Sequence, residues 1–256
     1  MNLKNIQEVL NEKGKIYFIS DVHLGAPALK DNHEREKKFV KWLSAVSTDA
    51  QMIFLMGDIF DYWFEYRKVV PRGFTRVLGK IAEITDNGIP VHFFTGNHDI
   101  WVFDYLPEET GVIVHYDPLT IELLGKKFFL AHGDGLDQND KGYIFLKKIF
   151  KSRPLQWLYA RLHPNFAVAL AQKWSKTSRL SKKVRGPEFE VEKEGMFQFA
   201  NSLVEKEHFD YIVLGHRHRL ANIPLKDNSR FILLGDWIKT FSYGVFDGKT
   251  FELKTF

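Results

Sequence analysis

The chain has 256 residues, of which 45% are hydrophobic and 15% aromatic, so it can bury one sizeable core and has little room for two. It contains no cysteine, which excludes disulfides, thiolate metal ligands and cysteine nucleophiles and suits a reducing cytoplasm. The formal net charge of +4 is unevenly distributed, because residues 141–190 carry 12 Lys and Arg against 2 Asp and Glu, whereas the rest carries 24 against 30.

Hydropathy excludes a membrane-spanning protein. No stretch approaches the roughly 20 apolar residues of a transmembrane helix, and residues 1–14 lack the apolar segment of a secretion signal. We therefore expect one soluble cytoplasmic domain over residues 1–256, with a basic helical insertion at about 141–187.

The first part of the chain alternates between two hydrophobic periodicities. Continuous apolar runs predict buried strands, and apolar residues at helical spacing predict amphipathic helices. The predicted strands cover residues 16–19, 52–56 and 91–95, and the helices cover residues 32–47 and 74–82. This β-α-β-α-β order is typical of a parallel sheet.

The predicted elements become shorter after Pro107. Strands are expected over residues 112–114, 121–124, 127–131 and 211–214, and a helix within 189–207. The Gly125-Lys126 pair indicates a hairpin, and two more are expected around Asp227-Asn228 and Asp247-Gly248.

Five of the predicted strands end in polar clusters, often beside glycine. Each cluster alone is ordinary turn chemistry, but the carboxyl ends of strands in such folds meet at a ligand site. Carboxylate, amide oxygen and imidazole are suitable ligands for a pair of divalent cations. The candidate ligands are Asp21, His23, Asp58, Asn97, His132, His216 and His218.

The order of these motifs resembles that of the calcineurin-like metallophosphoesterase superfamily. The motifs are Asp21-x-His23, Gly57-Asp58-x-x-Asp61, Gly96-Asn97-His98-Asp99, His132-Gly133 and Gly215-His216-x-His218. The resemblance implies an α/β fold in which a two-sheet β-sandwich is flanked by helices (αββα) and carries an inserted helical lid. It also implies two divalent ions, with Mn²⁺ favoured, although the ligand set tolerates Fe²⁺, Co²⁺ and Zn²⁺ as well.

The resemblance also implies how the ligands are shared. One metal would be held by Asp21, His23 and His218, and the other by Asn97, His132 and His216, with Asp58 bridging the two. His98 follows a ligand directly, so we expect it to face the phosphate as a cation or proton donor, with Asp61 orienting it. The alternative is that His98 is only a polar loop residue.

A narrower resemblance is to the UDP-2,3-diacylglucosamine pyrophosphatases of lipid A biosynthesis, a family within that superfamily. It rests on Gly57-Asp58-Ile59-Phe60-Asp61-Tyr62-Trp63, His132-Gly133-Asp134-Gly135-Leu136 and Leu234-Gly235-Asp236-Trp237. It implies hydrolysis of the substrate's pyrophosphate to UMP and 2,3-diacylglucosamine 1-phosphate (lipid X). The implied substrate contacts are Asn97, His98, Asp140, Tyr143, Ser175, Arg179, Lys182 and His216.

Two residues depart from the pattern of that family. Arg179 stands at one of the implied contacts, in place of Asn. His98 stands where many members have Arg, although His is the choice of the wider superfamily. The substitution keeps a potential cation beside the phosphate and adds a proton that can titrate.

The basic insertion contains apolar residues at helical spacing, interrupted by Pro154 and Pro164, which predicts two or three short amphipathic helices. These helices suit ordinary packing with solvated basic faces. They also suit an acyl-chain groove, for which the candidate lining residues are Leu155, Leu158, Leu162 and Phe166. A third use is peripheral attachment to an anionic inner membrane.

Two rival functions explain the same features differently. Interleaved aromatic and basic residues also suit nucleic acid, so the chain would be a phosphodiesterase or phosphatase acting on nucleotides or nucleic acid. The high share of Leu and Ile favours an acylated UDP-sugar instead. A non-catalytic scaffold of the same fold would have lost metal ligands, and all seven are present.

Overall fold

The computed structural model describes residues 14–171, 173, 191 and 194–256. The predicted β-α-β-α-β order is confirmed in the first part of the chain. The elements there are β1 (Lys15–Ile19), α1 (Asn32–Val46), β2 (Ala50–Leu55), α2 (Thr75–Asp86), β3 (Val91–Phe94), α3 (Tyr105–Thr110) and β4 (Ile113–His115).

The rest of the chain contains the predicted hairpins and short helices. Its strands are β5 (Leu119–Leu123), β6 (Lys126–Ala131), β7 (Tyr211–Leu214), β8 (Leu220–Pro224), β9 (Arg230–Leu234), β10 (Ser242–Phe246) and β11 (Phe251–Thr255). Its helices are α4 (Lys141–Lys151), α5 (Arg153–Tyr159), α7 (Gly195–Val204) and the 3₁₀ turn η3 (Lys226–Asn228), with a further helical stretch over residues 164–171. None of the helices in the described part of the chain is long and apolar enough to cross a bilayer.

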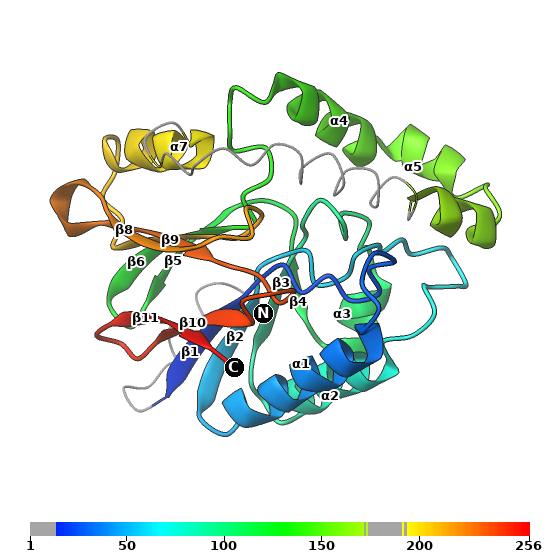
Figure 1. Cartoon of the computed structure of the whole chain (residues 1–256), viewed down its shortest axis with the longest axis horizontal. Helices are drawn as coiled ribbons and strands as arrows, with labels where there is room; N and C mark the ends of the chain where they lie inside the picture. The colour runs from blue at the N-terminus through cyan, green and yellow to red at the C-terminus, as the bar shows by residue number, and fades with distance from the viewer. Residues whose placement is uncertain (1–13, 172, 174–190, 192–193) are drawn as a thin grey trace.

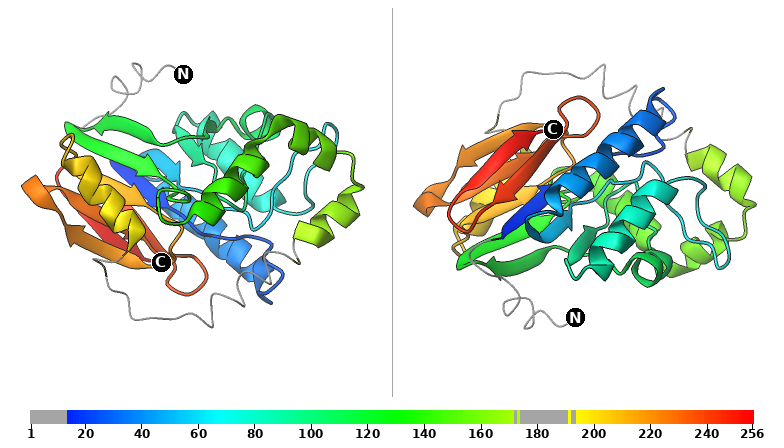
Figure 2. Two further views of the ribbon diagram at one scale, coloured as in Figure 1. Left: turned by 90° about the horizontal axis from the view of Figure 1, so that it is seen from above. Right: turned by 90° about the horizontal axis from the view of Figure 1, so that it is seen from below.

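Two mixed sheets pack face to face (Figure 1). The first has the order β11-β10-β1-β2-β3-β4, and β1 to β4 are parallel. The second has the order β5-β6-β7-β9-β8, and β6, β7 and β9 are parallel. Seen from below, α1 and α2 cover the first sheet, and seen from above, α7 covers the second (Figure 2). The predicted αββα fold class is confirmed.

The alternation of side chains along β1 explains the layers. Ile16 and Phe18 point into the core between the two sheets, whereas Tyr17 and Ile19 belong to the core between the first sheet and its helices. The predicted apolar face of α1 is buried in that second core, with Trp42 fully enclosed. A strand that is buried on both faces reads as a continuous apolar run, which is the pattern that the sequence shows.

Helix α3 was not among the predicted elements, because its N-terminus is capped from a distant part of the chain. Oε2 of Glu65 accepts hydrogen bonds from the N–H groups of residues 103, 104 and 105 at 2.6, 2.8 and 3.1 Å. Oε1 accepts from Leu106 at 3.3 Å and from the indole of Trp63 at 3.0 Å. A buried carboxylate thus satisfies the free amides of the first turn.

Candidate metal centre

The seven predicted metal ligands lie in loops that follow the carboxyl ends of five parallel strands. Loops after β1, β2 and β3 come from the first sheet, and loops after β6 and β7 come from the second, so the site lies where the two sheets meet. Ligand atoms lie within 4.8 Å of one another in two separate groups. The groups are Asp21, His23 and His218, and Asp58, His132 and His216. A third such group joins His23 to Asp61 and His98.

Five of the seven ligands have a left-handed backbone. The φ angles are 54° at Asp21, 49° at His23, 53° at Asp58, 66° at His216 and 53° at His218. This conformation costs on the order of 1 kcal/mol or more for a residue other than glycine. Hydrogen bonds between the loops hold this conformation. For example, the N–H of His23 donates to the carbonyl of Asp58 at 2.9 Å. Such clustering of strain is typical of functional sites.

The glycines of the motifs allow these loops to approach one another. A Cβ on Gly96 would lie 2.2 Å from Oδ1 of Asp58, and one on Gly57 would lie 2.6 Å from Nδ1 of His132. Both distances are far below van der Waals contact, so a side chain at either glycine would displace a ligand. Close packing therefore explains why glycine stands beside the ligands in the sequence.

The first group is compact around one oxygen of Asp21. Nε2 of His23 and Nε2 of His218 lie 3.6 and 3.4 Å from Oδ1 of Asp21, and 3.3 Å from each other. The two imidazole rings are stacked, with an interplanar angle of 12°. Oδ1 of Asp21 is buried and has no hydrogen-bond partner within the described chain, so it is available to a cation.

Asp58 lies between the two groups. Its Oδ2 is 3.4 Å from Nε2 of His132 and 3.6 Å from Nε2 of His23, which belong to different groups. Among the described residues, the buried Nε2 of His132 and Oδ1 of Asn97 also have no hydrogen-bond partner. Buried polar atoms are rarely left unpaired. Atoms of this kind, aimed at one region, fit two cations that share Asp58.

Charge complementarity inside the site shifts several pKa values. Burial raises the pKa of Asp21, but His218 and His23 outweigh it and hold the pKa at about 2. Burial likewise opposes ionisation of Asp58, but His132 and His98 hold its pKa well below the usual range. Burial lowers the pKa of His132, and Asp58 and Asp21 raise it more, to about 10. The carboxylates are therefore ionised at neutral pH, as cation binding requires.

The far nitrogens of the ligand rings are also held. Nδ1 of His23 donates to Oδ1 of Asp61 at 3.1 Å, and Nδ1 of His132 donates to the carbonyl of Met56 at 2.9 Å. Such contacts fix the tautomer, leave Nε2 for a metal and increase its basicity. The buried Arg35 of α1, which sequence reasoning missed, donates to the carbonyl of His23 at 2.5 Å.

His98 lies beside the two groups and at the edge of a cavity. Its main-chain N–H donates to Oδ1 of Asp58 at 2.8 Å, and its Nδ1 donates to the carbonyl oxygen of Asp61 at 2.8 Å. The Asp61 carboxylate is 3.7 Å away and bonds His23 instead, so Asp61 orients His98 mainly through its main chain. Burial lowers the pKa of His98, and Asp58 offsets part of that effect.

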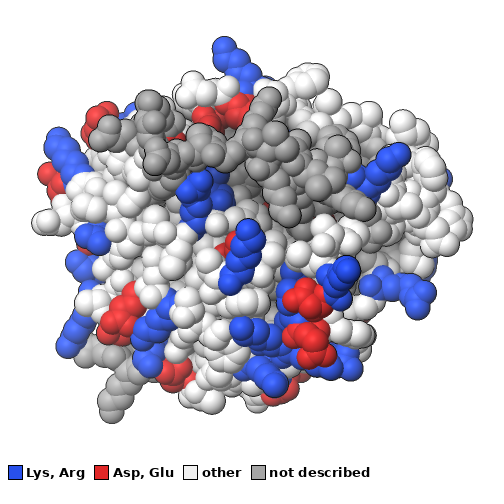
Figure 3. Space-filling model, viewed as in Figure 1, with Lys and Arg blue, Asp and Glu red and all other residues white. Residues whose placement is uncertain are grey.

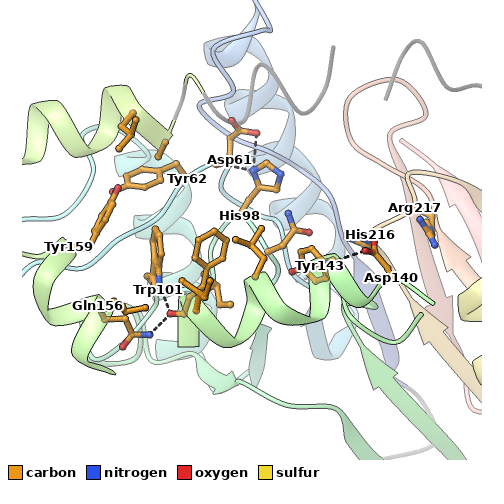
Figure 4. Close-up of a pocket in the computed structure, with 18 residues that line it drawn as sticks. Asp61, Tyr62, His98, Trp101, Asp140, Tyr143, Gln156, Tyr159, His216 and Arg217 are labelled. Carbon is orange, nitrogen blue, oxygen red and sulfur yellow. Dashed lines mark hydrogen bonds and ion pairs between the residues drawn. The ribbon is translucent and has the colours of Figure 1, made fainter. Parts of the chain in front are cut away.

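The cavity has a volume of about 500 Å³ and joins the metal centre to α4 and α5 (Figure 4). Its polar end is formed by residues of the ligand loops, including Asn97, His98 and His216. Its apolar part is formed mainly by aromatic and aliphatic side chains of the insertion and of the loop after β3. These residues are Ile100, Trp101, Leu146, Ile149, Phe150, Leu155, Tyr159 and Leu170.

Five of the eight implied substrate contacts line the cavity, namely Asn97, His98, Asp140, Tyr143 and His216. Asp140 and Tyr143 also bind the protein itself: Asp140 caps α4, and the hydroxyl of Tyr143 donates to Asp134 at 2.7 Å. The remaining three, Ser175, Arg179 and Lys182, lie outside the described residues. All four apolar residues predicted for an acyl groove are exposed, and of them only Leu155 lines the cavity.

Two buried carboxylates next to the ligand motifs had no assigned role in the sequence. Asp99 accepts the main-chain N–H groups of residues 58, 59, 60 and 96, and so holds the loops of Asp58 and Asn97 together. Asp134 receives the hydroxyl of Tyr143 and the ammonium of Lys147, which anchor α4 to the loop of His132. The only feature of the sequence that could have indicated these two roles is that Asp99 follows Asn97-His98 and Asp134 follows His132-Gly133.

A β-sandwich with buried carboxylates and imidazoles at its common edge defines the class of metal-dependent phosphoesterases. The chain belongs to the calcineurin-like phosphoesterase family, whose model matches residues 14–220. The family that the motifs predicted is thus confirmed.

The similarity to several known proteins extends over most of the chain and is not limited to the motifs. A UDP-2,3-diacylglucosamine hydrolase of Porphyromonas gingivalis is 43% identical over 261 residues, covering 95% of this chain and 98% of that protein. Proteins of the same name from Neisseria gonorrhoeae and Vibrio vulnificus are 28% and 29% identical. Both of these alignments cover 86% of this chain. They cover 89% of the Neisseria protein and 88% of the Vibrio protein.

Proposed function

We propose that the protein hydrolyses the pyrophosphate bond of UDP-2,3-diacylglucosamine to UMP and 2,3-diacylglucosamine 1-phosphate, a step of lipid A biosynthesis. The observation that carries the proposal is the cavity, because its polar end adjoins the metal ligands and its long wall is apolar. In UDP-2,3-diacylglucosamine, the pyrophosphate would lie at the polar end of the cavity and the two acyl chains along its apolar wall. The full-length similarity to hydrolases of that name supports the same substrate.

The centre would hold two divalent ions, and the family resemblance favours Mn²⁺. Asp21, His23 and His218 would hold one ion, Asn97, His132 and His216 the other, and Asp58 both. Bound divalent cations supply Lewis-acid chemistry, because they lower the pKa of water and offset charge on phosphoryl oxygens.

The side chains beside the ligands would orient the substrate and handle protons. His98 faces the cavity with one nitrogen held by Asp61, so its other nitrogen is free to approach a phosphoryl oxygen or to protonate the departing phosphate. Asp61 holds His98 by its carbonyl and His23 by its carboxylate. Asn97 and His216 line the same end of the cavity and would contact the phosphates.

The insertion would serve the lipid part of the substrate on its inner face. Leu146, Ile149 and Phe150 of α4 line the cavity together with Leu155 and Tyr159 of α5. Each buried methylene of an acyl chain contributes roughly 0.8 kcal/mol. An apolar wall of this kind would therefore select acylated over unacylated UDP-sugars.

The outer face of the same helices would rest on the cytoplasmic surface of the inner membrane. Phe145 of α4, Trp157 and Leu158 of α5, and Phe166 of the following helical stretch are 59–66% exposed, which is unusual for side chains of this size. Basic residues of α4 and α5 accompany them, and anionic lipids attract such residues. On the face in Figure 3, charges of both signs intermingle over α1 and α2, whereas the surface near α5 is mostly uncharged with isolated Lys and Arg side chains.

Cleavage of three substrates tests the proposal. We expect UDP-2,3-diacylglucosamine to be cut far faster than unacylated UDP-N-acetylglucosamine, and a single-stranded oligonucleotide not at all. Equal rates on all three would overturn the lipid assignment, and preference for the oligonucleotide would favour a nuclease.

A matched pair of variants separates the two faces of the insertion. Ile149→Asp places a charge in the cavity wall and should abolish preference for the acylated substrate. Leu158→Asp places it on the exposed surface, so it should spare cleavage in detergent and weaken sedimentation with anionic vesicles. If Leu158→Asp impaired cleavage as strongly as Ile149→Asp, the division into faces would be wrong.

A further inference from the structure

The loop after β9 lies beside the loop of His216 and His218 and contributes none of the seven candidate ligands. Residues 235–237 follow the carboxyl end of β9, and the loop of His216 and His218 follows that of β7. Because β7 and β9 are parallel neighbours, both loops leave the sheet at the same edge. Asp236 therefore occupies the position of a metal-ligand loop, although it belongs to neither group of ligands.

The two carboxylate oxygens of Asp236 have different partners. Oδ1 accepts the main-chain N–H groups of Ile238, Lys239 and Thr240 at 3.0, 2.7 and 3.1 Å, which closes a tight turn. Oδ2 lies 3.6 Å from Nδ1 of His218. The side chain is buried, so the turn holds the carboxylate in one orientation and directs the second oxygen at the imidazole.

The same segment contacts a second ligand of the same group. The N–H of Trp237 donates to the carbonyl of Asp21 at 3.0 Å, and the Trp237 side chain is fully buried. Nε2 of His218, on the far side of the ring from Asp236, lies 3.4 Å from Oδ1 of Asp21. Asp236 and Trp237 therefore hold His218 and Asp21 in a fixed relation to each other.

We propose that Asp236 is a positioning residue for His218, whose carboxylate fixes the imidazole so that Nε2 faces Asp21 and His23. The pair has the same arrangement as Asp61 and His23, although its separation of 3.6 Å is longer than the 3.1 Å between Oδ1 of Asp61 and Nδ1 of His23. A carboxylate behind a metal-binding imidazole sets its tautomer and increases its basicity. The inference rests on the two-metal part of the proposed function and is independent of the substrate.

Metal binding by Asp236→Asn tests the inference without any substrate. The amide keeps an acceptor for the turn and removes the negative charge opposite His218. In equilibrium dialysis with Mn²⁺, we expect one of the two ions to bind about 10- to 100-fold more weakly and the other to bind as in the wild-type protein. With Co²⁺, the visible absorption of one ion should change. Asp236→Glu, which keeps the charge, should recover part of the affinity.

Thr240→Val is the matched control for the turn. It removes the hydroxyl that donates to the carbonyl of Asp236 at 2.8 Å, accepts from its N–H at 3.1 Å and lies 3.3 Å from its Oδ1. The three main-chain N–H groups that hold the carboxylate remain. We expect a lower melting temperature with unchanged metal affinities. Affinities of Asp236→Asn equal to the wild type, or an equal loss in Thr240→Val, would overturn the inference. A wild-type protein that binds two ions but leaves the lipid uncut would instead overturn only the proposed substrate.

Discussion

The main-chain N–H of His98 donates to Oδ1 of Asp58 across 2.8 Å, so the residue assigned to the phosphate is attached to the carboxylate assigned to both metals. The contact involves the backbone of His98, which leaves its ring outside the metal groups of Asp58 and free to face the cavity. Replacing the ring should therefore separate turnover from metal content.

His98→Ala should retain both metal ions and lower turnover by on the order of 10²-fold or more, the usual effect of removing a positioned acid. Metal content by atomic absorption and steady-state rates on the same preparation measure the two effects. Loss of an ion together with the ring would instead identify His98 as a ligand, as its group with His23 and Asp61 permits.

His98→Arg distinguishes the two roles of that side chain. Burial lowers the pKa of His98, whereas arginine places a permanent positive charge beside the phosphate and does not release a proton at working pH. We expect substantial activity if His98 acts by charge, with a rate that no longer depends on the titration of residue 98. Activity as low as in His98→Ala would assign a proton-transfer role to the imidazole.

Asp58→Ala should cost more than Asn97→Ala, because Oδ2 of Asp58 lies near ligands of both groups. We expect Asp58→Ala to lose tight binding of both ions and Asn97→Ala to weaken one. Dialysis against Mn²⁺ followed by metal analysis gives the stoichiometry, and a chelator-treated wild type gives the baseline. Equal and mild losses in both variants would contradict a shared carboxylate.

A buried histidine pair away from the metal centre predicts how stability depends on pH. Nδ1 of His92 lies 2.8 Å from Nε2 of His115, and burial lowers their pKa values to about 3 and about 4. The unfolded chain binds protons below about pH 6.5 while the folded chain does not, so stability is full above that pH and falls below it. For His92 alone the loss at pH 5 is on the order of 2 kcal/mol.

Urea unfolding of the chelator-treated protein at pH 7.5 and pH 5 measures this effect. His92→Phe, which keeps a ring against Phe54, should reduce the dependence by removing one of the two buried titrating groups. A variant that loses as much stability as the wild type between the two pH values would show that other groups cause the loss.

Glu65→Gln should destabilise the fold by about 1–3 kcal/mol, because the amide cannot accept all the hydrogen bonds that the carboxylate accepts at the start of α3. Chemical denaturation measures the change. Glu122→Gln on the exposed face of β5 is the matched control and should have little effect. Metal content should be unchanged in both variants.

The meeting of the seven candidate ligands was predictable because each follows a buried strand, and parallel strands bring their carboxyl ends together. The support for those ligands was not predictable, because Asp99, Asp134 and Asp236 act through contacts with loops distant in sequence. Helix α3 was missed for the same reason, since Glu65 lies about 40 residues before the turn that it caps.

The sequence also did not predict which faces of the helices in the insertion point toward the cavity. Helical spacing identified the apolar residues but not which of them point inward, and Leu155 and Leu158 were assigned to one groove. In the structure Leu155 lines the cavity, and Leu158 faces solvent. When a helix has apolar residues on two faces, the spacing of those residues does not show which face lines a cavity and which faces solvent.

Asp58 and Asp21 raise the pKa of His132 to about 10, so its imidazole carries a proton at neutral pH. As a proposed metal ligand, this imidazole would have to lose the proton to bind a cation. Metal binding should therefore release protons into the buffer. The heat measured for metal binding should vary with the ionisation enthalpy of the buffer, and metal affinity should increase as the pH rises.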